Sequence, residues 1–386
     1  MEKQLKVGEG FKIIGFVLIA FGLFTVLTGL LTGDHVRTWA NLLLNNYYFM
    51  SVTIGATFWL AMQAITQSGW SAAYVRIPQA MSNYLIVSFI LWAFMFFGIH
   101  DLYHWTHHDA VMHDPILLHK EPYLNVPFFT IRYVLFFALW IFLTQRIKKL
   151  SLEEDKIGGL TNFNKIEFTS KVYIFVLAIT FSLFSIDWLM SLDPHWYSTI
   201  YAVKKFVMAF YHGTVMITAI AIILYKLGYL PALTKTHMGD FARYIFALSI
   251  IWGYIWLSQY ILIWYANIPE ETVYYVPRIL KEYKNYFYLE LIVNWAFPFL
   301  FLMWNRVAKN AWALLFVAVV LMAGQWIELY MSIMPDTADT HNITYIEVGT
   351  FLGYFALFAM VVTWSLARIP LVAKNHPYLI ESLEHH

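Results

Sequence analysis

The chain contains no cysteine and carries little charge. Of its 386 residues, 13% are Asp, Glu, Lys or Arg, and the formal net charge is +1. Without cysteine this chain cannot hold an iron–sulfur cluster through thiolates, nor attach a c-type haem, because both need thiols. A charge near zero, with no basic run interleaved with aromatics, gives no indication of nucleic-acid binding. So little charge also excludes an ordinary water-soluble domain.

Hydrophobic residues make up 60% of the chain and aromatic residues 19%, with a mean hydropathy of +0.59. A helix needs about 20 apolar residues to cross a hydrocarbon core of about 30 Å. We therefore predict an all-α polytopic membrane protein in which 1–386 form a single integral membrane domain. The ten predicted spans are 11–31, 48–68, 82–100, 127–146, 168–192, 200–225, 241–265, 287–305, 310–332 and 345–369.

The distribution of Lys and Arg predicts the orientation of these spans. Counted over alternating loops, 17 of the 25 lie on the side of the two termini and 8 on the other side. The positive-inside rule then places both termini in the cytoplasm. The first apolar run is too long for a signal peptide and no cleavage motif follows it, so we expect it to be retained as a helix.

A motif inside the membrane occurs twice. Ile-Asp-Trp-Leu-Met-Ser-Leu-Asp-Pro at 186–194 returns as Ile-Glu-Leu-Tyr-Met-Ser-Ile-Met-Pro at 327–335. The copies end the fifth and ninth spans, four helices apart, so they share an orientation, as a parallel repeat requires. We predict two four-helix bundles, 48–192 from spans two to five and 200–332 from spans six to nine, with helices one and ten at their flanks.

Three acids and one histidine are expected in or near the outer half of the membrane. At 1.5 Å per residue, Asp187 and Glu328 lie about 10 Å inward from the prolines that end their motifs. Glu290 also falls in the outer half, and His212 near the midplane. Basic residues at similar depth, expected as charge partners, are Arg132, Lys204 and Lys205.

Two interpretations of these groups stay open. Buried charges without partners rarely persist, so the acids and bases are expected to form structural ion pairs. The other interpretation is a polar pocket or proton exit, since a carboxylate or a histidine with a shifted pKa relays protons. In the cytoplasmic half we find no carboxylate within a predicted helix, so a complete proton path is not predicted.

The inner loop 147–167 is expected to turn flexibly at Gly158 and Gly159.

A histidine-rich stretch, His-Asp-Leu-Tyr-His-Trp-Thr-His-His at 100–108, has spacings that place imidazoles on one helical face. A membrane di-iron site needs further histidine boxes, and the later histidines are single, so we predict no metal site. We expect an interfacial loop that faces a partner. His212 has no mate at its depth, so a haem bound by this chain is not predicted either.

The segment Asp-Trp-Leu-Met-Ser-Leu-Asp-Pro-His-Trp-Tyr-Ser-Thr-Ile-Tyr at 187–201, with ten spans and cytoplasmic termini, resembles the ActF-like membrane subunits of bacterial alternative complex III. These belong with the NrfD and polysulfide-reductase membrane-anchor family. The resemblance covers essentially the whole chain. Asp187 and His195 match its specific motif, and His212, Glu290 and Glu328 are added from their depth alone.

The resemblance implies a multi-pass subunit of a respiratory quinol:electron-acceptor oxidoreductase in the bacterial cytoplasmic (inner) membrane. Partner subunits would hold the c haems and iron–sulfur clusters, and a related NrfD-like membrane subunit and a terminal oxidase would be further partners. This chain would bind no metal centre of its own. It would support the interaction with quinone or quinol, proton transfer, or both, at Asp187, His195, His212, Glu290 and Glu328.

Two other functions fit the same residues. A proton-coupled secondary transporter would use the repeat to build a central substrate site, and such sites lie near the midplane beside broken helices. A purely structural membrane anchor would have every buried charge paired. By itself this chain performs no complete redox reaction in any of these interpretations, since no electron carrier is evident in it.

Overall fold

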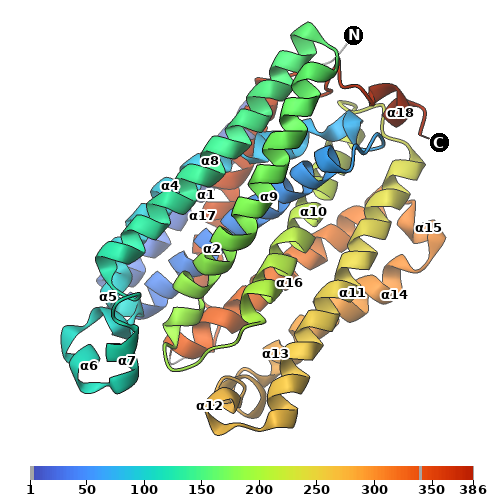
Figure 1. The fold of residues 1–386 in the computed structure, drawn as a ribbon. Coiled ribbons are helices and arrows are strands. Elements are labelled where there is room, and N and C mark those ends of the chain that lie inside the picture. The colour runs from blue at the N-terminus through green and yellow to red at the C-terminus, as the bar shows by residue number, and fades with distance from the viewer. Residues whose placement is uncertain (1–3, 339–340, 386) are drawn as a thin grey trace.

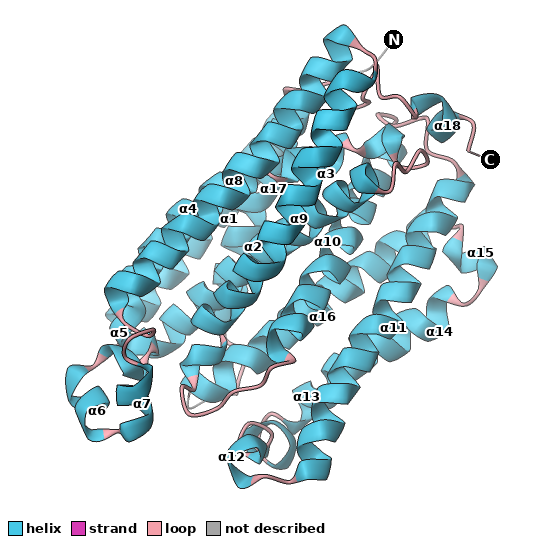
Figure 2. Ribbon diagram, in the orientation of Figure 1, coloured by secondary structure: helices cyan, strands magenta, loops and turns pink. Residues whose placement is uncertain are grey.

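The structure is a computed structural model, and it describes residues 4–338 and 341–385. Every regular element in these residues is a helix (Figure 2). Within this described part of the chain, which is all-helical, nine helical segments are long and apolar enough to cross a membrane, as in a multi-pass protein. They are α1 (Glu9–Leu31), α2 (His35–Ile65), Ala72–Leu102 with α3 (Arg76–Met81) and α4 (Tyr84–Phe94), α8 (Val126–Ile157), Leu160–Leu192 with α9 (Leu160–Trp188), α10 (Tyr201–Lys226), α11 (Lys235–Ala266), α16 (Ala311–Thr337) and α17 (Tyr345–Ala367).

The predicted span 287–305 is not one regular helix. It consists of α13 (Lys284–Leu291), a π-helical turn (Ile292–Ala296) and α14 (Phe297–Leu302). The turn precedes Pro298, which has no N–H to give to the carbonyl of Asn294, four residues earlier. That carbonyl instead accepts a hydrogen bond of 3.1 Å from the hydroxyl of Tyr211 on α10. A neighbouring helix thus supplies the donor that the proline removes.

Helix α2 lies in the middle of the bundle, where it contacts α9, α10, α16 and α17. Nearly its whole length is buried. It crosses α10 with almost no space between the backbones, because a Cβ added at Gly55 would lie 1.7 Å from the carbonyl oxygen of Ala209. A Cβ at Gly213 would lie 2.5 Å from the backbone of α2. The two predicted four-helix units are therefore in direct contact through α2 and α10.

Helices α1 and α17 form a close pair of their own. A Cβ at Gly22 of α1 would lie 2.7 Å from the Cα of Gly353 on α17. Small residues at such a contact allow two membrane helices to approach closely. The large apolar side chains elsewhere on α1, such as Phe16 and Phe24, are exposed and suit contact with lipid.

The bundle has two distinct ends (Figure 1). The terminal end holds both ends of the described chain, where the side chain of Gln4 donates to the carbonyl of Ala367. The opposite end, called the distal end here, carries the longer connections. The short helices are α5 (Ile99–Leu102), α6 (His108–His113), α7 (Pro115–Lys120) and α12 (Pro269–Thr272) at the distal end, and α15 (Asn305–Ala308) and α18 (Leu379–Leu383) at the terminal end.

Two sequence predictions about the region around the end of α8 need correction. The loop 147–167 is much shorter than expected, because α8 continues to Ile157 and α9 begins at Leu160. The predicted turn is present, with φ of +69° at Gly158 and +76° at Gly159. The prediction that no carboxylate lies within a helix in the terminal half is wrong, since Glu154 lies in the last turns of α8 and is fully buried.

Candidate functional site

Glu328, the acid of the second motif copy, lies on α16 in a buried polar cluster. Its Oε1 is 3.3 Å from the Nζ of Lys205 on α10, and its Oε2 accepts a 2.7 Å hydrogen bond from the indole N–H of Trp252 on α11. The side chains of Lys205 and Glu328 have no solvent exposure. Three helices therefore meet at this carboxylate, and Lys205 is one of the bases that the sequence predicted as charge partners.

The serine of the motif connects the same groups. Ser332 donates to the backbone carbonyl of Glu328 at 2.7 Å and accepts a 2.6 Å hydrogen bond from Lys205. In the first copy, Ser191 likewise donates to the carbonyl of Asp187, four residues before it. The serine thus has the same local role in both copies, and only in the second does it also bind a lysine.

A second acid and a second lysine lie beside this pair. The Nζ of Lys204 is 3.6 Å from Oε1 of Glu290 on α13, and both side chains are buried. That contact is an ion pair without hydrogen-bond geometry, and Glu290 Oε1 has no hydrogen-bond partner. Lys204 also interacts electrostatically with Glu328. Two lysines and two glutamates thus form one buried cluster, in which one carboxylate oxygen can accept a further hydrogen bond.

Arg278 closes the distal side of this cluster. Pro335 in α16 has no N–H for the carbonyl of Met331, and Arg278 Nε donates to that carbonyl at 2.9 Å. Its Nη2 donates to Asp336 at 2.6 Å, and its guanidinium lies 3.5 Å from the ring centre of Tyr274. Burial lowers and the Asp336 carboxylate raises the pKa of Arg278, and the net result is a raised pKa. The motif proline therefore creates the acceptor that positions this arginine.

His212 lies on α10, further toward the centre of the bundle. Its Nδ1 donates to the carbonyl of Met208 at 2.9 Å, and its Nε2 lies 3.2 Å from Oδ1 of Asn294 in the π-helical turn. Asn294 Nδ2 donates to the carbonyl of Gly324 at 3.1 Å, so its oxygen faces the histidine. Because both partners of the ring are acceptors, this geometry satisfies an imidazolium at both nitrogens and a neutral imidazole at one.

Asp187, the acid of the first copy, has a different environment. Arg132 on α8 donates to both of its carboxylate oxygens, from Nε at 2.7 Å and Nη2 at 3.1 Å. The guanidinium lies 3.9 Å from the ring centre of Tyr123 and 4.4 Å from that of Phe128. A two-point contact between planar groups, held between aromatic rings, fixes the geometry of the pair. The ion pairs expected for Arg132, Lys204 and Lys205 are thus all present.

The structure does not bring His195 to either cluster. His195 lies half-exposed in the connection between α9 and α10, where its Nε2 is 2.5 Å from Oδ2 of Asp114. The contact with His195 holds the pKa of the Asp114 carboxyl below its ordinary value, against a smaller effect of burial. Lys120 also reaches this connection, donating to the carbonyl of Pro194 at 2.5 Å. His195 therefore links the distal loops to each other.

The histidine-rich stretch at 100–108 folds into short helical turns at the distal end. His107 Nε2 bonds the carbonyl of His100, and His100 Nδ1 bonds the hydroxyl of Thr106, so these rings are used in local contacts. Within the described residues, no three His, Asp or Glu side chains converge as a metal would require. The prediction of a loop that faces a partner stays a prediction.

Sequence reasoning missed several buried polar groups. Asn46 of α2 is buried with neither its amide oxygen nor its nitrogen bonded, and Gln325 of α16 donates to Ser51 at 3.0 Å while its oxygen stays unbonded. Glu154 in α8 has two unbonded carboxylate oxygens. The sequence signal for Asn46 was the pair Asn45-Asn46 directly before an apolar run. The signal for Glu154 was an acid that continues the helical spacing just beyond an apolar run.

Comparisons with known proteins add no assignment to this geometry. No family model matches the chain, and the search of curated proteins gives no match.

Proposed function

We propose that this chain is an ActF-like membrane subunit of a respiratory quinol:electron-acceptor oxidoreductase. It would have ten spans, with the segment 284–302 as the eighth, in two four-helix units, and its terminal end would face the cytoplasm. Its role would be to support the interaction with quinol and to conduct the released protons near the outer face. The support from sequence is the motif at 187–201, and the support from structure is the cluster around Glu328.

One observation carries the proposal, namely that Glu328 and Glu290 share a buried volume with two lysines and keep one oxygen free of hydrogen bonds. Buried lysines change protonation state more readily than arginines, because the ammonium is a compact, strongly hydrated charge that burial penalises. A cluster of two such bases and two acids can hold a varying number of protons. That property is what proton transfer requires and a static anchor does not.

The residues also fit a hydroxyl donor. Glu290 Oε1 is a buried acceptor without a hydrogen-bond partner, and an unsatisfied group of this kind is costly unless a ligand or water meets it. Quinol, when bound, supplies two electrons and two protons, the electrons passing to haem and iron–sulfur centres in partner subunits. Glu290 would accept the hydrogen bond, and the protons would be held by Glu290 and Glu328 while Lys204 and Lys205 compensate their charge.

The path of a proton from this cluster would lead to the distal end. Asp336 lies beyond Glu328 on α16 and is bound by Arg278, and its side chain is 15% exposed. On the other side, His212 interacts electrostatically with Glu328 and has two acceptor partners. We propose that His212 holds a proton at the inner limit of the cluster and that the Arg278–Asp336 pair controls its distal limit.

In this proposal the Asp187–Arg132 pair has a structural role. Its two hydrogen bonds and the rings on Arg132 leave no group free to accept a proton without breaking the pair. Asp187 would therefore fasten α9 to α8, and the second copy of the motif would perform the proton chemistry. His195 would contribute to the packing of the distal loops.

A proton-coupled transporter remains a second candidate, favoured by the interrupted helix at 292–296. Broken helices beside a midplane site are typical of transporters, and the π-helical turn places Asn294 against His212. The purely structural anchor is favoured by the pairing of each buried acid of the motif. It predicts that neutralising Glu328 impairs assembly and leaves the turnover of assembled complex unchanged.

The deciding experiment is purification of the tagged chain in mild detergent, with mass spectrometry of the co-purifying proteins and a reduced-minus-oxidised visible spectrum. We expect multihaem and iron–sulfur subunits, a related membrane subunit and a c-type haem spectrum. A colourless protein that purifies alone would overturn the respiratory assignment and favour the transporter. A coloured complex whose turnover is unchanged by Glu328→Gln and Glu290→Gln would instead support the anchor.

A further inference from the structure

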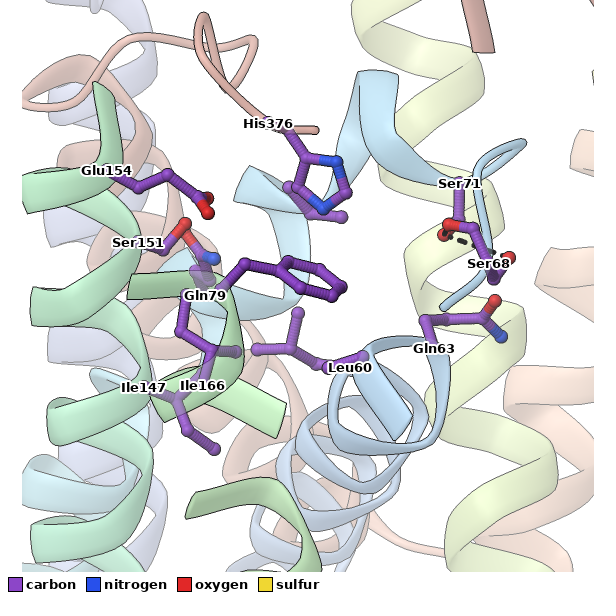
Figure 3. A pocket seen from close by; sticks show the side chains of 13 residues that line it. Leu60, Gln63, Ser68, Ser71, Gln79, Ile147, Ser151, Glu154, Ile166 and His376 are labelled. Atoms are coloured by element: carbon purple, nitrogen blue, oxygen red, sulfur yellow. Dashed lines mark hydrogen bonds between the residues drawn. The ribbon is translucent and has the colours of Figure 1, made fainter. Parts of the chain in front are cut away.

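A small cavity lies at the terminal end, on the side of the bundle opposite the cluster around Glu328. Its volume is about 30 Å³, and its walls come from α2, the turn after α2, α3, α8, α9 and the segment after α17. Figure 3 shows the Glu154 carboxylate and the His376 ring on one side and Gln63, Ser68 and Ser71 on the other, with the Gln63 amide directed away from Glu154. Segments far apart in the chain thus contribute polar groups to the cavity, beside apolar side chains such as Leu60, Ile147 and Phe163.

Glu154 is the group that this cavity must accommodate. The residue is fully buried, and neither carboxylate oxygen has a hydrogen-bond partner. Gln63 Oε1, across the cavity, is also buried without a partner. An unsatisfied buried amide or hydroxyl costs on the order of 1–3 kcal/mol, and a bare carboxylate costs more. The cavity thus has two acceptors at its walls, and each needs a donor.

The protein supplies only part of what Glu154 needs. Arg76 is the nearest cation from α3, and its guanidinium already bonds Asp155, Gln79 and Ser151. It acts on Glu154 through electrostatic attraction, which the neighbouring carboxylate of Asp155 opposes. The cavity-lining residues of α2 and α9 carry no titratable side chain. Glu154 is therefore close to compensating charge but has no hydrogen bond from it.

His376 provides a donor on the remaining wall. Its Nδ1 accepts a 3.2 Å hydrogen bond from the backbone N–H of Tyr378, so a neutral ring carries its hydrogen on Nε2. Burial, assisted by the charge of Arg76, lowers the pKa of His376 to about 4, so the ring is neutral near pH 7. The segment after α17 thus presents an N–H to the cavity without adding a charge.

The volume fits water. A cavity needs about 10–15 Å³ of this measure to hold one water molecule, and the water needs two to four polar partners. About 30 Å³ with Glu154, Gln63, His376 and serine hydroxyls at its walls meets both requirements. An apolar or larger organic ligand would not fit in this volume.

We propose that this cavity is a hydrated binding site for an exchangeable proton, with Glu154 as the group that holds it and water as the ligand that delivers it from the terminal end. The site lies at the other end of the bundle from the proposed quinol chemistry and does not depend on that function. Gln63 continues it toward α11 through a 3.2 Å hydrogen bond to the hydroxyl of Tyr244.

Infrared difference spectroscopy of the purified chain in H₂O and D₂O tests this proposal. In the wild-type protein we expect a protonated-carboxyl band that loses intensity as pH rises and shifts within seconds to minutes of transfer to D₂O. Glu154→Gln should lower the intensity of that band by the contribution of one carboxyl group. The matched control is Glu153→Gln, the neighbouring acid, whose side chain is 42% exposed and 4.0 Å from Lys149, and this variant should retain the band.

A second variant keeps the test decisive if Glu154→Gln does not fold. Ala64→Val adds apolar atoms at the cavity wall without changing any titratable group, and it should slow the deuterium shift at least tenfold by displacing water. A band whose intensity Glu154→Gln leaves unchanged, or one that shifts equally fast in the Ala64→Val variant, would overturn the proposal. A wild-type protein without an exchangeable carboxyl band would do the same.

Discussion

Breaking the Lys205–Glu328 pair should destabilise the fold far more than breaking an exposed pair. Both side chains have no solvent exposure, so Glu328→Gln leaves Lys204 and Lys205 facing Glu290 alone, and Lys205→Met leaves two acids facing one base. Removing one partner of a buried pair costs about 3–5 kcal/mol, because the other charge stays buried without compensation. We expect each single variant to lose stability in that range.

The double variant Lys205→Met/Glu328→Gln separates the pair energy from local damage. It removes both charges, so its loss of stability should be well below the sum of the two single losses, with a coupling of about 2 kcal/mol or more. The assay is reversible unfolding of the detergent-solubilised protein in increasing sodium dodecyl sulfate, followed by circular dichroism. Lys149→Met and Glu153→Gln form the control cycle, since that pair is 4.0 Å apart and exposed and should couple by about 0–1 kcal/mol.

Equal coupling energies in the two cycles would refute the reasoning. That outcome would mean that water or lipid head groups reach Lys205 and Glu328 and screen their attraction. A double variant as unstable as the sum of the singles would point the same way, because independent sites give additive losses. Either result would also weaken the proton-transfer proposal, which depends on these groups compensating each other's charge.

Three further predictions follow from other parts of the molecule. Asp187→Asn should reduce the amount of assembled protein while turnover per assembled complex stays within twofold, whereas Glu328→Gln should lower turnover at least tenfold, as quinol-oxidation assays on purified complex would measure. Gly213→Ala should prevent correct packing of α2 on α10, since its Cβ would lie 2.5 Å from the backbone of α2, whereas Gly10→Ala has open space and should behave as wild type in gel filtration. The third concerns pH: the pKa of His376 falls from 6.5 to about 4 on folding, so the unfolded state binds more protons between these values and stability should decline as pH drops through that window. Hydrogen exchange in the segment after α17 should report the decline, and a profile unchanged by His376→Phe would contradict it.

The sequence predicted the presence of the membrane helices better than it predicted their ends. Hydropathy found α1 and α17, whose large side chains are exposed. It placed the start of the second span at 48, although α2 begins at His35, because Asn41, Asn45 and Asn46 lower the hydropathy of a helix that is surrounded by other helices. A buried helix tolerates such residues, so its polar turns do not mark its end.

The candidate site was predicted as a set of depths rather than as a set of contacts. Counting residues from Pro194 and Pro335 placed Asp187 and Glu328 correctly with respect to bases in the same half of the membrane. It could not say which base each acid would bind, because that depends on how α8, α10 and α16 are rotated about their axes. Glu154 was missed for another reason: α8 continues past its apolar run, and the end of hydrophobicity was taken for the end of the helix.

The two copies of the motif show how one local pattern can serve different ends. In both, the serine four residues after the acid donates to the acid's backbone carbonyl, although α9 ends at Trp188 whereas α16 continues past Pro335 to Thr337. The two copies differ in the base that binds the acid. The guanidinium of Arg132 stays charged and donates to both carboxylate oxygens of Asp187. The ammonium of Lys205 donates to one oxygen of Glu328 and also to the hydroxyl of Ser332. Replacing either base by the other type should therefore impair the role of its own copy of the motif. Lys205→Arg should therefore slow turnover while it preserves the ion pair, and Arg132→Lys should weaken assembly while it preserves the charge.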